Sequence, residues 1–147
     1  MKNILCILFF IFLNSPQIFS QERYRLVFEK DYNQSSISNY NFLLTLETLE
    51  QKTITKTNLT FFAPTDLNFN NNFCFLLICF TNDVEIKKKT SSEFESPNKV
   101  VFLLEEKDIN ILKFHKLEFI QFSEPTNQQM FFKNSFSTEE EAIFKNI

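Results

Sequence analysis

The absence of glycine constrains this chain more than any other feature. None of its 147 residues is glycine, whereas 21 are phenylalanine. Glycine adopts a positive φ without steric cost, so turns that need this geometry must here use Asn or Asp. Asn70, Asn71 and Asn72 are the expected substitutes. Phosphate-binding loops and dinucleotide fingerprints also require glycine, and the sequence therefore excludes nucleotide binding of those types.

Residues 1–20 have the pattern of a secretory signal peptide. Lys2 precedes an apolar run at residues 4–13, and we expect cleavage after Ser20. The run is shorter than the about 20 residues that cross a bilayer, and an uncleaved anchor is the alternative. We therefore expect residues 21–147 to form one exported domain, secreted, at the cell surface or, in a bacterium, periplasmic. Membrane contact is expected only through an uncleaved leader.

The charge of the chain gives no support to nucleic-acid binding, and the spacing of its cysteines argues against a disulfide within the chain. Without Lys2, 14 basic residues remain against 18 acidic ones, which gives no support to nucleic-acid binding, because that needs a basic patch. Cys74 and Cys79 would lie about 16 Å apart on a straight strand, beyond the about 7 Å that a disulfide allows. We expect two buried free thiols, and pairing with another chain stays open.

The most informative run is residues 58–69. A short buried strand is expected at residues 59–63, and Pro64 stops it because proline cannot donate a ladder hydrogen bond. Thr65 or Asp66 can then cap a helical turn. The run therefore predicts a strand-to-helix corner at the centre of the domain.

This corner resembles the first signature of the fasciclin (FAS1) adhesion domain, roughly T-x-F-A-P-T-[DN]-x-A-F. The matching residues are Thr60, Phe62, Ala63, Pro64, Thr65, Asp66 and Phe69, while Asn68 stands where the family has Ala. Residues 111–115 are similar to its second signature, with Phe114 in place of Tyr before His115.

The resemblance implies an α+β fold, a small mixed β-sheet with a few packed helices, in a divergent and incomplete FAS1-like module. It also implies adhesion or surface binding without a cofactor, with a cell-surface or matrix protein or a glycan as partner. The apolar run at residues 73–80 departs from the family, which continues there with helices. An all-β sandwich is the alternative fold, and this run discriminates the two.

Several segments can be assigned from their patterns. Residues 23–31 alternate between apolar and charged side chains until Val27 interrupts the alternation, and this pattern predicts a first strand. Residues 38–51 support both a helix and a strand, and the resemblance favours the helix. The apolar run at residues 73–80 is expected as a doubly buried strand or one side of a helix. Residues 81–99 are expected as a solvated loop.

The C-terminal third contains two further elements. Residues 105–110 are expected as a charged break. Residues 111–122 are either a bulged strand or a helix that ends near His115, followed by a strand from Leu117. Residues 123–127 are expected as a turn. Ser137 and Glu140 form a capping box, which predicts a final helix.

The sequence predicts no catalytic, cofactor-binding or metal-binding residue. His115 is the only histidine, so a two-histidine metal site cannot be built. We expect its imidazole to be hydrogen-bonded at the end of an element, and the resemblance implies surface contact instead. No serine has the glycine-containing context of a nucleophile elbow. Asn33 and Asn58 begin candidate glycosylation sequons.

Three functions follow, in order of preference. The first is a secreted or cell-surface adhesion or binding module without catalysis. The second is a lineage-restricted, β-rich secreted or periplasmic protein in which the signature is a coincidence. The third is a small secreted hydrolase, which would need a Ser or Cys beside His115.

Overall fold

The computed structural model describes residues 23–33, 40–50, 55–64, 69, 73–90, 96–124 and 130–147. The expected leader at residues 1–20, the candidate caps Thr65 and Asp66, the Asn-rich turn at 70–72 and most of the turn expected at 123–127 lie outside these residues.

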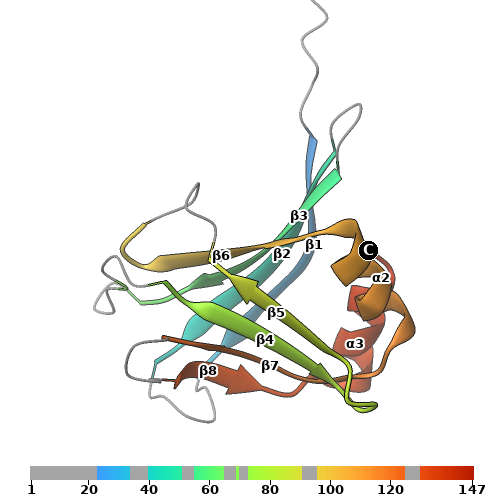
Figure 1. Ribbon diagram of the computed structural model, residues 1–147. Helices are drawn as coiled ribbons and strands as arrows, with labels where there is room; N and C mark the ends of the chain where they lie inside the picture. Colours follow the sequence, from blue (N-terminus) through green and yellow to red (C-terminus); the bar gives the residue numbers. More distant parts are fainter. Residues whose placement is uncertain are drawn as a thin grey trace, which may run out of the picture.

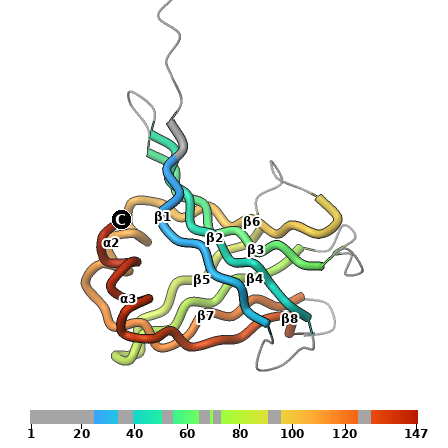
Figure 2. The backbone as a smooth tube through the Cα atoms, turned by 180° about the vertical axis from the view of Figure 1, so that it is seen from behind, coloured from blue at the N-terminus to red at the C-terminus, as the bar shows by residue number. Residues whose placement is uncertain are grey.

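The described residues form eight strands in two antiparallel, four-stranded sheets that face each other (Figure 1). Sheet A has the order β1-β2-β3-β6, with bounds Arg23–Tyr32, Phe42–Glu50, Thr55–Phe62 and Lys99–Leu104. Sheet B has the order β5-β4-β7-β8, with bounds Glu85–Lys89, Phe75–Phe80, Leu117–Ser123 and Met130–Asn134. Helices α2 (Glu106–Phe114) and α3 (Thr138–Lys145) lie at one end, the helix end, as both backbone views show (Figures 1 and 2). Neither of these helices is long and apolar enough to cross a bilayer.

The expected α+β, FAS1-like fold is therefore wrong, and the architecture is the all-β alternative. The decisive error concerns residues 38–51, which were expected to be helical. Residues 42–50 instead form β2, which lies between β1 and β3 in sheet A. Phe42, Leu44 and Leu46 point into the core from alternate positions. Local spacing allowed both structures, and the two neighbouring strands select the extended one.

Phenylalanine rings hold the two sheets together. The ring of Phe61 on β3 lies 4.4 Å from that of Phe122 on β7 and 5.0 Å from that of Phe132 on β8. Phe42 on β2 makes an edge-to-face contact with Phe122 at 5.4 Å. These rings are almost completely buried. A single apolar core between the sheets is thus the main source of stability.

Several strand predictions are confirmed. β1 contains the interruption expected at Val27, since its register with β2 shifts between Leu26 and Phe28. The strand expected at residues 59–63 is part of β3 up to Phe62. Residues 75–80 form β4, and a strand in this run favours the β-rich alternative over the FAS1 resemblance.

The solvated loop expected at residues 81–99 is wrong in part, because residues 85–89 form β5 and pair with β4. The hairpin between these two strands contains Asp83, the one described non-glycine residue with a positive φ, 63°. Asp thus replaces glycine in this turn, as the composition predicts.

Local signals predict α3 and the end of α2 but miss the start of α2. α2 ends at Phe114 and β7 begins at Leu117, which confirms the second of the two alternatives for residues 111–122. The expected break at residues 105–110 is wrong, because α2 starts there with a capping box between Glu105 and Asp108. The capping box of α3, Ser137 with Glu140, is confirmed.

Candidate binding surface on sheet B

The residues of the first signature build a corner at the loop end of the molecule, opposite the helices. Thr60 is buried in β3. Phe62 ends that strand, and the amide of Ala63 donates to the carbonyl of Asn98 over 2.8 Å. The amide of Phe69 donates to the carbonyl of Pro97 at the same distance, and the Phe69 ring is buried. Pro64 is partly exposed beside them. These contacts tie Ala63 and Phe69 to the segment that precedes β6.

The second signature lies at the other end of the molecule. Phe62 pairs with Lys99 at the start of β6, whereas α2 follows the end of β6 and carries Phe114 and His115 at its C-terminus. Phe114 is 82% exposed. The structure therefore does not bring the two signatures together.

His115 lies between the end of α2 and the β4–β5 hairpin. Its backbone amide donates to the carbonyl of Ile111 at the end of α2. Its Nδ1 lies 2.8 Å from Nδ2 of Asn82, and its ring lies edge-on to Phe80 at 5.9 Å. The histidine thus joins the β4–β5 hairpin to the end of the helix.

The two described cysteines are weakly acidic thiols, and the expected burial is confirmed for Cys74 but wrong for Cys79, which is only partly buried. Burial, assisted by the Glu124 carboxylate, raises the pKa of Cys74 to about 12. Burial also raises the pKa of Cys79, followed by the effects of Glu85 and Glu118. Since the thiolate is the nucleophile and metal ligand, neither cysteine is prepared for that chemistry at neutral pH. The described residues also contain no group of three or more His, Cys, Asp or Glu arranged to hold a metal.

The candidate sequons differ in their environment. Asn33 is exposed just after β1, whereas Asn58 is buried in β3, between two neighbouring strands. Only Asn33 is therefore placed where a glycan could be attached without displacing a strand.

The outer face of sheet B is unlike the rest of the described surface. Alternate residues of β4 point into the core, namely Leu76, Ile78 and Phe80. The intervening residues face outward, and the pairing places them in cross-strand rows. The first row is Lys89, Phe75 and Ser123, with Met130 opposite Ser123; the second is Lys87, Leu77, Gln121 and Lys133; the third is Glu85, Cys79 and Phe119.

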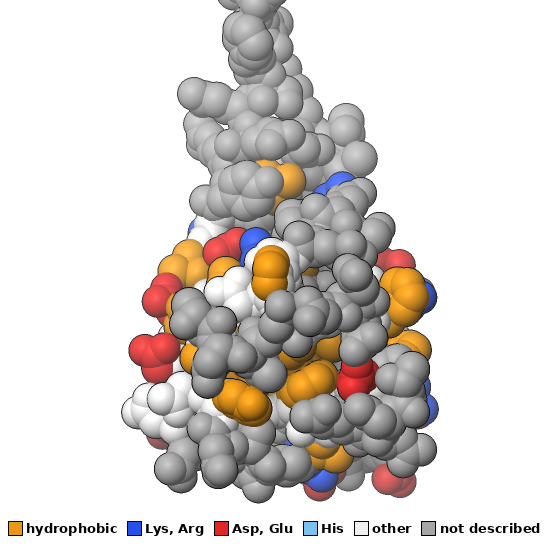
Figure 3. All heavy atoms as spheres, turned by 90° about the vertical axis from the view of Figure 1, so that its left-hand side faces the viewer, with side chains coloured by type: hydrophobic (Ala, Val, Ile, Leu, Met, Phe, Trp, Pro, Cys, Tyr) orange, Lys and Arg blue, Asp and Glu red, His pale blue; other side chains and the backbone are white. Residues whose placement is uncertain are grey.

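Aromatic rings and lysines dominate the first two rows. Phe73, just before β4, is 50% exposed, and Phe75 is 44% exposed. The Nζ atom of Lys89 lies 3.3 Å from the centroid of the Phe73 ring, and that of Lys133 lies 4.1 Å from the Phe119 centroid. We call this the basic-aromatic surface, defined by Phe73, Phe75, Leu77, Lys87, Lys89 and Lys133. Figure 3 looks at the loop end, where hydrophobic side chains reach the surface.

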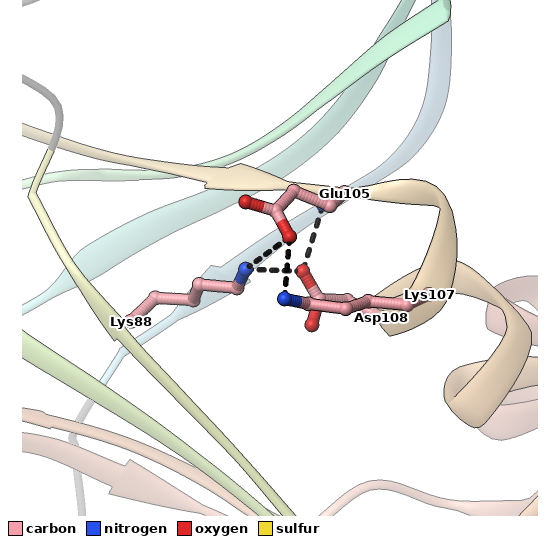
Figure 4. A network of polar contacts seen from close by, with 4 residues as sticks. All are labelled: Lys88, Glu105, Lys107 and Asp108. Carbon is pink, nitrogen blue, oxygen red and sulfur yellow. Dashed lines mark hydrogen bonds and ion pairs between the residues drawn. The ribbon is translucent and has the colours of Figure 1, made fainter.

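The charged cluster at the helix end is the other candidate (Figure 4). Lys88 lies between Lys87 and Lys89 in β5 but points the opposite way, and its Nζ lies 2.5 Å from Oδ2 of Asp108 and 3.6 Å from Oε2 of Glu105. The amide of Glu105 donates to the same Asp108 oxygen over 2.7 Å.

Lys107 completes this cluster through an ion pair of 2.7 Å with Glu105. The hydrogen bond from Lys107, together with the charge of Lys88, lowers the pKa of Glu105. Each charge of the cluster has a partner within it, so its role is to fix the start of α2 to the edge of sheet B.

Sequence reasoning missed the basic-aromatic surface. The run at residues 73–80 is apolar throughout, so it gives no sign of which side chains face outward. The alternation in β5 was hidden because Lys87, Lys88 and Lys89 are identical. A hairpin register between the two segments would have revealed the rows, but the turn contains no glycine signal.

Comparisons with family models, with curated proteins and with solved structures find no match for this chain. The site is therefore interpreted from its own geometry.

Proposed function

We propose that this chain is an exported binding module without catalysis, and that the basic-aromatic surface of sheet B is its contact surface. The observation that carries the proposal is the pair of half-exposed rings, Phe73 and Phe75, flanked by Lys87 and Lys89. Exposed apolar groups of this kind, rimmed by polar ones, mark interaction sites on soluble proteins. Phenylalanine is also enriched at protein contact surfaces.

The scaffold supports the proposal because it holds these side chains rigidly. β4 is hydrogen-bonded to β5 on one side and to β7 on the other, and its inner side chains are locked in the core. A surface on such a strand loses little conformational entropy on binding. We infer export from the leader pattern at residues 1–20. Export would bring the contact surface outside the cytoplasm.

The proposal is tested by binding of the exported, fluorescently labelled protein to intact cells of the species that encodes it. The variant Phe73→Ser/Phe75→Thr removes both exposed rings, and Thr suits a strand position. Phe114→Ser is the matched control, because this ring is even more exposed but lies on α2.

We expect the double variant to lose at least about 10-fold in cell binding, which corresponds to about 1.4 kcal/mol. The control is expected to bind like the wild type. Equal binding by all three proteins would refute the proposal.

A further inference from the structure

The charges on the outer face of sheet B are segregated along the strands. The first two rows contain Lys89, Lys87 and Lys133 and no acidic residue. Acidic side chains appear at the third row, with Glu85 opposite Cys79 and Glu118 close to it. Lys87 and Glu85 form an ion pair, with 2.5 Å between Nζ and Oε1, that joins the second row to the third. Lys89 and Lys133 are the other two cations of these described rows, and the hairpin end of this face is acidic.

This segregation has an effect although the whole chain has a net charge of −3. Phe75 and Cys79 are four residues apart on one strand, or about 13 Å. That distance exceeds the Debye length of about 8 Å at physiological ionic strength. A ligand on the first row therefore interacts mainly with Lys89, and the carboxylates of the third row, one of which is paired with Lys87, are largely screened from it.

The apolar and cationic groups are also ordered across the strands. Phe75 and Leu77 form a column on β4, Lys89 and Lys87 flank it on β5, and Lys133 flanks it on β8. Lys89 keeps its ammonium group over the Phe73 ring. Long basic side chains whose stems lie along apolar surface while their charged ends stay in water are typical of membrane interfaces. A ligand that matches this order has an apolar layer bordered by a plane of negative charge.

We propose that the basic-aromatic surface docks on a lipid bilayer that carries anionic headgroups. This inference rests on the proposed function and names the ligand of the same surface. The rings of Phe73 and Phe75 enter the boundary between headgroups and acyl chains, while the ammonium groups of Lys89 and Lys133 contact the headgroup anions. Lys87 joins them by exchanging its exposed ion pair with Glu85 for a headgroup. Each lysine near an anionic membrane strengthens binding about five-fold, so docking is reversible and decreases with added salt.

The test is co-sedimentation of the exported protein with vesicles of phosphatidylcholine alone or with about one third phosphatidylserine. We expect binding only to the vesicles that contain phosphatidylserine. The variant Lys87→Glu/Lys89→Glu removes two cations and adds two anions, and we expect it to bind at least about 25-fold more weakly.

A matched variant, Lys113→Glu/Lys116→Glu, makes the same change in net charge at the C-terminal end of α2 and just after it. We expect it to keep most of the binding. An equal loss in both variants would show that net charge alone decides, and would overturn the inference. Absence of phosphatidylserine-dependent binding would overturn it too.

An acidic protein is the competing ligand, and soluble polyglutamate serves as its probe. Binding to polyglutamate without binding to vesicles would overturn the lipid assignment and leave the proposed function in place. The proposed function itself fails only if cell binding does not depend on Phe73 and Phe75, so the two failures are distinguishable.

Discussion

The Nζ atom of Lys88 lies 2.5 Å from Oδ2 of Asp108, so the middle one of three consecutive lysines is bound at the start of α2. Its neighbours Lys87 and Lys89 face outward from the same strand. One short strand thus contributes both to stability and to the proposed contact surface, through alternate residues.

Removal of the Lys88 ammonium should destabilise the fold, because Asp108 is 3% exposed and would lose its cation. We expect Lys88→Ala to lower the free energy of unfolding by about 2 kcal/mol, between the values for exposed and fully buried pairs. Lys107→Ala is the control, since its side chain is largely exposed, and we expect it to leave the free energy of unfolding nearly unchanged. Urea denaturation measures both, and similar losses would contradict this role of Lys88.

The phenylalanine core should be the largest single contribution to stability. Phe122 contacts the rings of Phe42, Phe61 and Phe132. Phe122→Ala should therefore cost about 3–5 kcal/mol, a large part of the about 5–15 kcal/mol by which a domain is usually stable. Phe114→Ala removes an exposed ring and should change stability by less than about 0.5 kcal/mol. Thermal denaturation followed by circular dichroism compares the two, and a tolerated Phe122→Ala would refute this packing.

The buried hydroxyl of Tyr32 should be dispensable. Tyr32 is 8% exposed, and its hydroxyl has no hydrogen-bond partner among the described residues. A buried polar group without a partner costs about 1–3 kcal/mol. Tyr32→Phe keeps the ring contact with Phe132 at 5.1 Å and should raise the unfolding free energy by about 1 kcal/mol. A clear loss of stability in the urea midpoint would mean that the hydroxyl is bonded in solution.

Cys74 should make the free energy of unfolding fall as the pH rises above 9. Its pKa is raised to about 12 in the folded protein from an ordinary value of 9, so the folded state holds the proton more tightly. The raised pKa therefore contributes to the free energy of unfolding. This contribution is fully present below pH 9 and is lost as the pH rises toward 12. At pH 10 the wild type should lose about 1.4 kcal/mol more than Cys74→Ala does.

Unfolding curves at pH 8 and pH 10 for both proteins give this difference directly. Parallel losses in the two proteins would indicate that other groups are responsible.

Local signals predicted part of the helical structure. The Ser137–Glu140 capping box predicts α3, and the end of a helix near His115 was one of two alternatives that the pattern left open. The capping box of Glu105 and Asp108 is also local, but its charges were interpreted as a break. Strand pairing is not local, and it decided the other errors. Residues 42–50 have spacing suited to both structures, and only β1 and β3 on either side make them extended.

The contact surface was missed for the same reason. Phe75 and Lys89 are 14 residues apart and become neighbours through the register of a hairpin. Neither residue is unusual in its own segment. Their juxtaposition is a property of the sheet, and no local pattern contains it.

The central claim is that the outer face of sheet B makes the contact, and a fluorescent probe on each outer face tests it directly. An environment-sensitive dye is attached at Ser123→Cys, in the first row, or at Asp31→Cys, on the outer face of sheet A. Both variants carry Cys79→Ser, and buried Cys74 stays unlabelled. On addition of cells of the encoding species, we expect a blue shift and brighter emission only from the probe at position 123. A response only from position 31, or none at either position, would contradict the account.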